Sequence, residues 1–152
     1  MRVAGLDVST KAAHYTIWDG KSAVAYGAMT EREEVSGLLR MNVDVVYIEQ
    51  IPFIPRAGHQ TMRKLCEAVG VWRERCEAVG LTVKTIPVSE WKVMSLGRGF
   101  GTATKDQVRA MILATTDVPL GQPQDIYDAC GVAISGYQTE KMNAKMAGVL
   151  AP

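Results

Sequence analysis

The sequence predicts an α/β domain built on a mixed sheet, and three observations support this fold class. Residues 1–29 contain strand-type segments in which apolar and polar residues alternate around a hairpin-type Asp19-Gly20 pair. The nearly continuous apolar run 43–48, rich in β-branched residues, is typical of a buried central strand. Helical patterns then alternate with one more strand segment, which favours helices packed in layers on the sheet.

Five segments are expected to form the strands. Val3, Leu6 and Val8 favour a strand at the start of the chain, and Gly5 allows another segment to approach its backbone closely. The first three strands are expected to form an antiparallel meander, with the first and fourth as neighbours at the centre of the sheet. The expected strands cover residues 2–8, 14–19, 22–28, 43–48 and 81–86.

Local signals at helix ends predict the helices that flank this sheet. Glu31 and Glu33 place acids in the first turn of one helix, and Thr104 and Gln107 have the spacing of a capping box. The tail from Thr139 is expected to be loosely held. The expected helices begin at Thr30 and Pro87 and cover about 57–79, 104–114 and 123–137.

Length and composition favour one domain in the cytoplasm. A chain of 152 residues is large enough to bury a substantial core. It contains no run long enough to span a bilayer and no signal-peptide layout, so no membrane partner is expected. Its three cysteines are an odd number without metal-type spacing, which is typical of reduced thiols.

Charge is unevenly distributed along the chain, although the net charge is only +1. Lys and Arg exceed Asp and Glu by five over residues 56–109, whereas acids exceed bases by two in the segments on either side. A basic middle could follow a phosphate backbone. The alternative is a solvated helix face, and charge alone favours that alternative.

Four acidic residues lie where a site would be built from distant parts of the chain. Asp7 and Glu49 each end an apolar strand segment, and Asp125 and Asp128 share one face of the last expected helix. An isolated Asp in such a setting is more often a helix cap or turn residue. Four together predict an all-oxygen site for two Mg²⁺ or Mn²⁺ ions, which could direct a water at a phosphodiester.

Four short motifs occur in order along nearly the whole chain. They are Gly5-Leu-Asp7-Val-Ser9, Tyr47-Ile-Glu49-Gln50, Thr104-Lys105-Asp-Gln-Val108 and Asp125-Ile-Tyr-Asp128-Ala129. This ordered set resembles the RuvC family of Holliday-junction resolvases, within the ribonuclease-H-like superfamily. The resemblance implies a five-stranded mixed sheet, three antiparallel strands followed by parallel ones, in a single nuclease domain over residues 1–152.

The resemblance also implies a function. A protein of this family is a metal-dependent, structure-selective endonuclease, a homodimer that resolves four-way DNA junctions by paired symmetric nicks. Such a chain acts in the bacterial cytoplasm, or in that of the host if a phage encodes it. The residues that match the family's catalytic set are Asp7, Glu49, Asp125 and Asp128, which would hold the metals, and Lys105 near the scissile phosphate.

Seven residues are expected to contact DNA. Phe53 resembles an aromatic that wedges against bases, although an aromatic between two prolines is more often a loop anchor. Helix 57–79 is apolar around more than one face, which makes it the candidate for a dimer interface. The alternative is a buried monomer helix, and the family resemblance favours the dimer interface. The remaining expected contacts are Lys92 and Lys105, Arg98 in the loop 97–103, and Arg63, Lys64 and Arg73 on helix 57–79.

Two other functions remain open on the sequence. The segment from Gly5 to Thr10 also resembles the phosphate motif of sugar-kinase and actin-like ATPases, which need two such domains. The chain could also bind junctions without cutting them. His14 and His59 lack ligand spacing and are given no metal, and the tryptophans, Trp91 among them, are assigned to the core or an interface.

Overall fold

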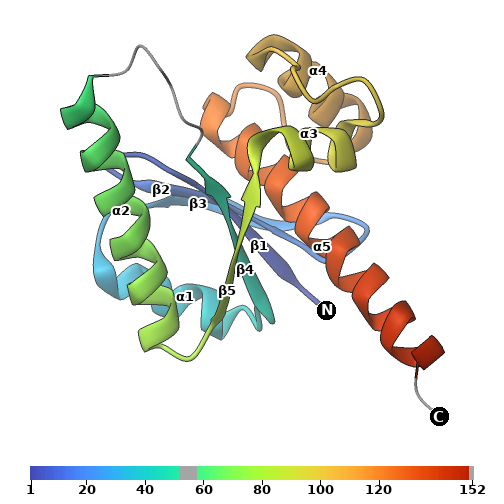
Figure 1. Ribbon diagram of the computed structural model, residues 1–152, viewed down its shortest axis with the longest axis horizontal. Helices are drawn as coiled ribbons and strands as arrows, with labels where there is room; N and C mark the ends of the chain where they lie inside the picture. Colours follow the sequence, from blue (N-terminus) through green and yellow to red (C-terminus); the bar gives the residue numbers. More distant parts are fainter. Residues whose placement is uncertain (52–57, 151–152) are drawn as a thin grey trace.

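A five-stranded sheet in the order β3-β2-β1-β4-β5 runs through the part of the chain that the structure describes (Figure 1). The structure is a computed structural model, and it describes residues 1–51 and 58–150. β1 pairs antiparallel with β2 and parallel with β4, as the sequence predicts. The strands are β1 (Val3–Val8), β2 (Ala13–Trp18), β3 (Ala23–Met29), β4 (Val45–Gln50) and β5 (Thr82–Pro87).

Helices cover both faces of the sheet. α1 and α2 lie against one face, and α3, α4 and α5 form a layer on the other (Figure 1). Across the described residues, none of these helices is both long and apolar enough to cross a membrane. Their bounds are η1 (Arg32–Glu34), α1 (Val35–Arg40), α2 (His59–Ala78), α3 (Val88–Leu96), α4 (Lys105–Thr115) and α5 (Gln124–Leu150).

The two helical layers bury two separate apolar clusters, one on each side of the sheet. Val3, Val45 and Tyr47 belong to the cluster under α3, α4 and α5. Leu6 and Ile48 belong to the cluster under α1 and α2. Because successive strand residues point to opposite faces, a strand covered on both sides must be apolar almost throughout. This explains the continuous apolar runs of β1 and β4.

α5 lies directly on the backbone of β1. A Cβ at Gly5 would lie 2.2 Å from the carbonyl oxygen of Ala129 and 2.4 Å from the amide nitrogen of Ala133. The buried Thr16 hydroxyl donates to the carbonyl oxygen of Ile126 at 3.2 Å, which ties the start of α5 to β2. The missing side chain at position 5 therefore sets how closely the helix approaches the sheet.

The predicted end of the last helix is wrong. The helix was expected to stop near Tyr137 with a loose tail from Thr139, but α5 continues to Leu150. Residues 138–148 are mostly good helix formers without proline, and propensity carries the helix past the core. Thr139 and Glu140 are still partly buried, whereas residues 141–148 are exposed.

Substitution of Gly5 by alanine should destabilise the protein. The new methyl would meet helix backbone, which cannot rotate away, and overpacking of this kind costs about 1–3 kcal/mol or more. Urea unfolding followed by circular dichroism measures this cost. The matched control is Gly70→Ala in α2, where a Cβ meets nothing within 4 Å and should stabilise by roughly 0.5–1 kcal/mol. Equal stability of Gly5→Ala and the wild type would contradict the close β1–α5 contact.

Candidate active site

β1 and β4 deliver the first two acids to one end of the sheet. The two strands are parallel, with Leu6 in register with Ile48, so Asp7 and Glu49 follow at the same edge. Both side chains are only partly exposed. This confirms the predicted placement of the two central strands as neighbours.

The first turns of α5 bring the other two acids. One carboxylate oxygen from each of Asp7, Asp125 and Asp128 lies within 4.8 Å of the other two. The Gln124 side-chain amide donates to Asp128 Oδ1 at 3.0 Å and fixes the orientation of that carboxylate. Asp125 and Asp128 are three residues apart on one helix, so both reach the end of β1.

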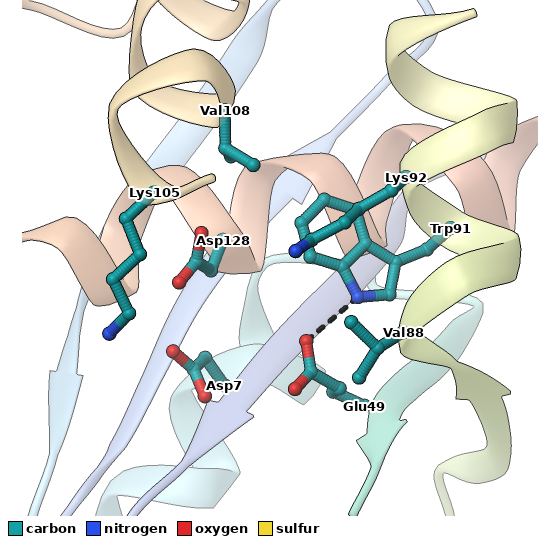
Figure 2. Close-up of a pocket in the computed structure, with 8 residues that line it drawn as sticks. All are labelled: Asp7, Glu49, Val88, Trp91, Lys92, Lys105, Val108 and Asp128. Atoms are coloured by element: carbon teal, nitrogen blue, oxygen red, sulfur yellow. Dashed lines mark hydrogen bonds between the residues drawn. The ribbon is translucent and has the colours of Figure 1, made fainter. Parts of the chain in front are cut away.

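A pocket of about 180 Å³ opens beside these acids (Figure 2). Its polar wall contains Asp7, Glu49 and Asp128, and Figure 2 shows Lys105 extended toward Asp7 and Asp128. The residues that line the pocket are Asp7, Glu49, Val88, Trp91, Lys92, Lys105, Val108 and Asp128. Two lysines and three acids from five elements therefore meet in one small space.

The two lysines lie on α3 and at the start of α4. Lys105 is the first residue of α4 and lies within the predicted capping box, in which the Thr104 hydroxyl accepts from the backbone N–H of Gln107 at 3.3 Å. The Thr104 backbone N–H in turn donates to the Gln107 side chain at 2.9 Å. Lys92 on α3 donates from Nζ to the carbonyl oxygen of Ala103 at 2.7 Å, which links α3 to the segment before α4.

Burial and mutual repulsion raise the pKa values of three of the acids. The pKa of Asp7 rises to about 8, first because of burial and then because of the negative charges of Glu49, Asp128 and Asp125; Lys105 opposes the rise. Burial also raises the pKa values of Glu49 and Asp128. Carboxylates held this close at neutral pH need a proton or a cation between them.

This donor set fits a hard divalent cation. Carboxylate oxygens are the ligands that Mg²⁺ and Mn²⁺ prefer, and three of them here lie close enough to share one ion. Lys105 offsets the negative charge only in part, since the pKa of Asp7 remains well above its ordinary value. Among the described residues, the acids at the end of the sheet could therefore hold a metal.

Trp91 is a site residue that the sequence reasoning missed. It is 1 % exposed and belongs to the core, as predicted, but its indole Nε1–H also donates to Glu49 Oε2 at 2.7 Å. This hydrogen bond counteracts the rise in the pKa of Glu49 that burial causes. Its position next to Lys92 on a short helix was the available signal in the sequence.

His14 is a second residue near the site that was assigned no role. It lies opposite Asp7 in the β1–β2 register, and its Nδ1 is 3.3 Å from Asp125 Oδ2. The predicted antiparallel pairing of residues 2–8 with 14–19 would have placed His14 beside Asp7. The sequence prediction considered only the spacing of metal ligands and not this cross-strand position.

Four further expected DNA contacts, Arg63, Lys64, Arg73 and Arg98, do not line the pocket. Arg63, Lys64 and Arg73 are exposed on α2, on the opposite face of the sheet from α3, α4 and α5 (Figure 1). Arg63 pairs with Glu67 at 3.1 Å and Arg73 with Glu77 at 2.9 Å, along the helix. Arg98 is exposed in the turn after α3.

The structure does not describe Phe53, the residue predicted to wedge against bases. Phe53 lies outside the described residues, so its two interpretations, wedge and loop anchor, both stay predictions.

The segment after β1 forms a closed turn. The Ser9 hydroxyl donates to the carbonyl oxygen of Ala12 at 3.0 Å and accepts from the backbone N–H of Ala12 at 3.1 Å. Ser9 therefore already uses its hydroxyl within the turn. The ATPase alternative, which needs this segment to hold phosphate, has no support from the geometry.

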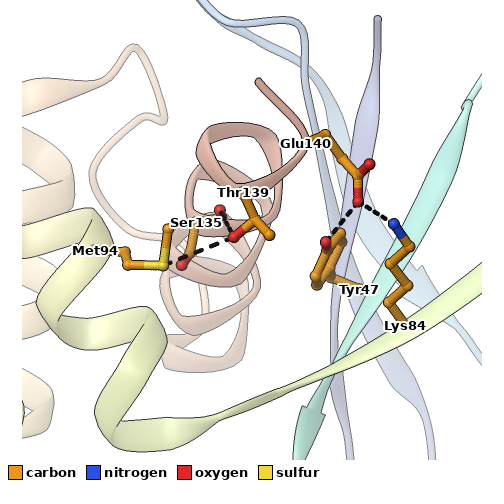
Figure 3. A network of polar contacts seen from close by, with 6 residues as sticks. All are labelled: Tyr47, Lys84, Met94, Ser135, Thr139 and Glu140. Atoms are coloured by element: carbon orange, nitrogen blue, oxygen red, sulfur yellow. Dashed lines mark hydrogen bonds and ion pairs between the residues drawn. The ribbon is translucent and has the colours of Figure 1, made fainter. Parts of the chain in front are cut away.

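α5 is held at a second point, beyond the site (Figure 3). The Glu140 carboxylate accepts from the Tyr47 hydroxyl at 2.6 Å and pairs with Lys84 of β5. Thr139 donates to the carbonyl oxygen of Ser135 at 3.0 Å. The helix that carries Asp125 and Asp128 thus crosses the sheet with both its first turns and its middle fixed.

Part of the chain is similar in sequence to one group of curated proteins. No protein-family model matches it. It is 34% identical over 73 residues to the crossover junction endodeoxyribonuclease RuvC of Shewanella oneidensis, and 36% identical over the same length to that of Shewanella piezotolerans. Each match covers 46% of this chain and 42% of the relative, so the chain spans less than half the length of these curated relatives.

Solved structures match over nearly the whole chain. The structure of Thermus thermophilus RuvC in complex with a Holliday junction substrate has a TM-score of 0.79 at 18% identity, over 94% of this chain and 96% of that one. A second structure, described only as Thermus thermophilus RuvC, has a TM-score of 0.73, also at 18% identity. This match covers 94% of this chain and 97% of that one. These comparisons confirm the predicted resemblance to RuvC proteins and the predicted ribonuclease-H-like fold.

The raised pKa of Asp7 predicts how stability depends on pH without divalent cations. A carboxyl whose pKa is raised from 3.8 to about 8 on folding contributes stability that is fully present below about pH 4 and lost as the pH rises through 8. Asp7→Asn should therefore be more stable than the wild type at pH 8–9, by at least the roughly 1.4 kcal/mol of one pKa unit.

Thermal unfolding in EDTA from pH 4 to 9 measures this difference, which should shrink towards pH 4. The matched control is Asp106→Asn, because Asp106 is an exposed acid in the first turn of α4 that does not line the pocket. A constant difference between Asp7→Asn and the wild type would contradict a strongly raised pKa of Asp7.

Proposed function

We propose that this chain is a RuvC-type resolvase, a metal-dependent and structure-selective endonuclease that cuts four-way DNA junctions by paired symmetric nicks. The observation that carries the proposal is the convergence of Asp7, Glu49, Asp125 and Asp128 with Lys105 at one end of the sheet. The similarity in fold to a RuvC protein described with a Holliday junction substrate supports branched DNA as the ligand.

The four acids would hold two Mg²⁺ or Mn²⁺ ions. Asp7, Asp125 and Asp128 are close enough to share one, and Asp7 with Glu49 would hold the other. Bound ions of this kind activate a water and stabilise the leaving oxygen of a phosphodiester. Asp7 would take part in both sites, because the negative charges of Glu49, Asp128 and Asp125 all act on it.

The two lysines would act on the substrate phosphate. Lys105 is exposed at the mouth of the pocket and carries positive charge toward the acids (Figure 2). It is placed to neutralise charge that builds on the phosphate during cleavage. Lys92 is partly buried and fixed to Ala103, so it holds a second positive charge at a defined position.

DNA beyond the scissile phosphate would meet the residues around the pocket. Arg98, in the exposed turn after α3, is proposed to contact a neighbouring phosphate. Phe53 is proposed to stack against bases near the crossover. Arg63, Lys64 and Arg73 on α2 would reach DNA only at the border of a dimer, because their helix lies behind the sheet.

Paired cuts require two acid clusters, and we propose a homodimer that supplies them. One chain holds one cluster, and a four-way junction has near two-fold symmetry that a two-fold dimer matches. α2 is the proposed interface, since Val71 is 43 % exposed and Met62, Leu65 and Val69 are only partly buried. Apolar side chains left over on a long helix are typical of a surface that a partner covers.

Asp7→Asn should abolish nicking and leave junction binding largely intact. Asp7 is central to the proposed metal sites, whereas affinity for DNA comes mostly from basic residues. Labelled four-way junction, duplex and single-stranded DNA are incubated with each protein, with Mn²⁺ and without it. Gel shifts in EDTA measure binding, and Asp106→Asn is the control that should still cut.

The outcomes of this experiment separate the candidate functions. Wild-type protein that nicks the junction only with Mn²⁺ supports the proposal. Wild-type protein that binds junctions but never cuts would instead be a binding module. Near wild-type cleavage by Asp7→Asn would mean that the chemistry takes place elsewhere.

Dimers that contain one inactive chain should nick one strand and fail to resolve the junction. Wild-type chains carrying an affinity tag are mixed with untagged Asp7→Asn chains, and the mixed dimers are purified through the tag and a size difference. On a closed cruciform plasmid, these dimers should give nicked circles, and wild-type dimers should give linear product. Paired cuts by a protein that stays monomeric in solution and on DNA would rule out the dimer.

A further inference from the structure

Glu49 is held by a buried, uncharged donor. The Trp91 Nε1–H donates to its Oε2 at 2.7 Å, from a side chain that is 1 % exposed. Figure 2 shows the Glu49 carboxylate between the indole of Trp91 and the side chain of Asp7. An indole N–H does not titrate, so the donor is present at every pH.

The indole itself has almost no freedom to move. A Cβ at Gly131 on α5 would lie 2.5 Å from Cζ3 of Trp91, so the ring fits against helix backbone where only a glycine leaves space. Trp91 belongs to the apolar cluster under α3, α4 and α5. The N–H is therefore positioned by packing between two helices and not by the carboxylate that it contacts.

This hydrogen bond determines which part of Glu49 is available to a cation. With Oε2 engaged by the indole, Oε1 is the oxygen left to face Asp7 across the pocket. Donors that hold the ligands of a metal fix their orientation and tune the affinity of the site. Without the N–H, the carboxylate at the end of β4 could rotate about its χ angles and lose its alignment with Asp7.

We propose that Trp91 is a positioning residue for Glu49, whose indole N–H fixes one carboxylate oxygen and sets the affinity for the cation that Glu49 and Asp7 share. The inference rests on the proposed function, since it assigns Trp91 a part in that metal site. It adds that α3 contributes to metal binding through its core tryptophan as well as to DNA binding through Lys92.

Trp91→Phe tests this role, because phenylalanine keeps an aromatic ring against Gly131 and removes the donor. Mn²⁺ binding is measured by the electron paramagnetic resonance signal of the free ion, and junction cleavage is followed in single turnovers over a range of Mn²⁺ concentrations. Binding at the Glu49 site should weaken by about 10- to 100-fold. The Mn²⁺ concentration for half-maximal cleavage should rise by the same factor, with cleavage recovering at saturating Mn²⁺.

Two further variants separate positioning from packing. Trp18→Phe changes a tryptophan of the same apolar cluster whose indole N–H has no hydrogen-bond partner among the described residues, and it should leave Mn²⁺ binding unchanged. In a Glu49→Ala background, Trp91→Phe should weaken Mn²⁺ binding no further, because the carboxylate through which it acts is gone. An equal loss in both backgrounds would show that Trp91 acts only by holding the fold, and would overturn the inference.

If Trp91→Phe does not fold, benzothienylalanine at position 91 keeps the size of the indole and replaces its N–H with sulfur. The same weakening of Mn²⁺ binding is then expected. Wild-type affinity in the folded variant would overturn the inference and leave the proposed function intact. Wild-type protein that neither binds Mn²⁺ nor nicks junctions would overturn the proposed function, and the inference with it.

Discussion

The contact between the backbones of β1 and α5 is the constraint on which the site depends. Only a glycine at position 5 lets the helix lie this close to the strand, with Ala129 and Ala133 against it. The first turns of α5 are thereby brought to the end of β1, where their acids meet Asp7. A shift of the helix by the width of one methyl group would separate the carboxylates that have to share an ion.

Repulsion among the buried carboxylates destabilises the fold, and neighbouring side chains offset part of this cost. Burial and mutual repulsion raise the pKa of Asp7 to about 8, and Lys105 relieves this only in part. Trp91 stabilises ionised Glu49 with its indole N–H, and Gln124 does the same for Asp128. A cluster of carboxylates that repel one another is typical of a metal site. A bound cation removes this repulsion, which the protein's own lysine and hydrogen-bond donors relieve only in part.

Local sequence determined much of this protein. The mostly apolar segments 2–8 and 43–48 specify buried strands, and Asp7 and Glu49 lie where these segments reach the end of the sheet. The i, i+3 spacing of Asp125 and Asp128 places both acids on one helix face without reference to any other element. The capping box of Thr104 and Gln107, which encloses Lys105, is equally local, which is why the start of α4 was predicted correctly.

Tertiary structure alone decided the rest, because it depends on contacts between segments far apart in the chain. Nothing local to Trp91 indicates that Glu49 will accept its N–H, since β4 and α3 meet only after the sheet forms. The length of α5 depends in part on Glu140 reaching Tyr47 and Lys84, which no nearby residue signals. Amphipathic pattern alone likewise cannot assign a helix to one face of a sheet that is buried on both, because either face offers the same apolar surface.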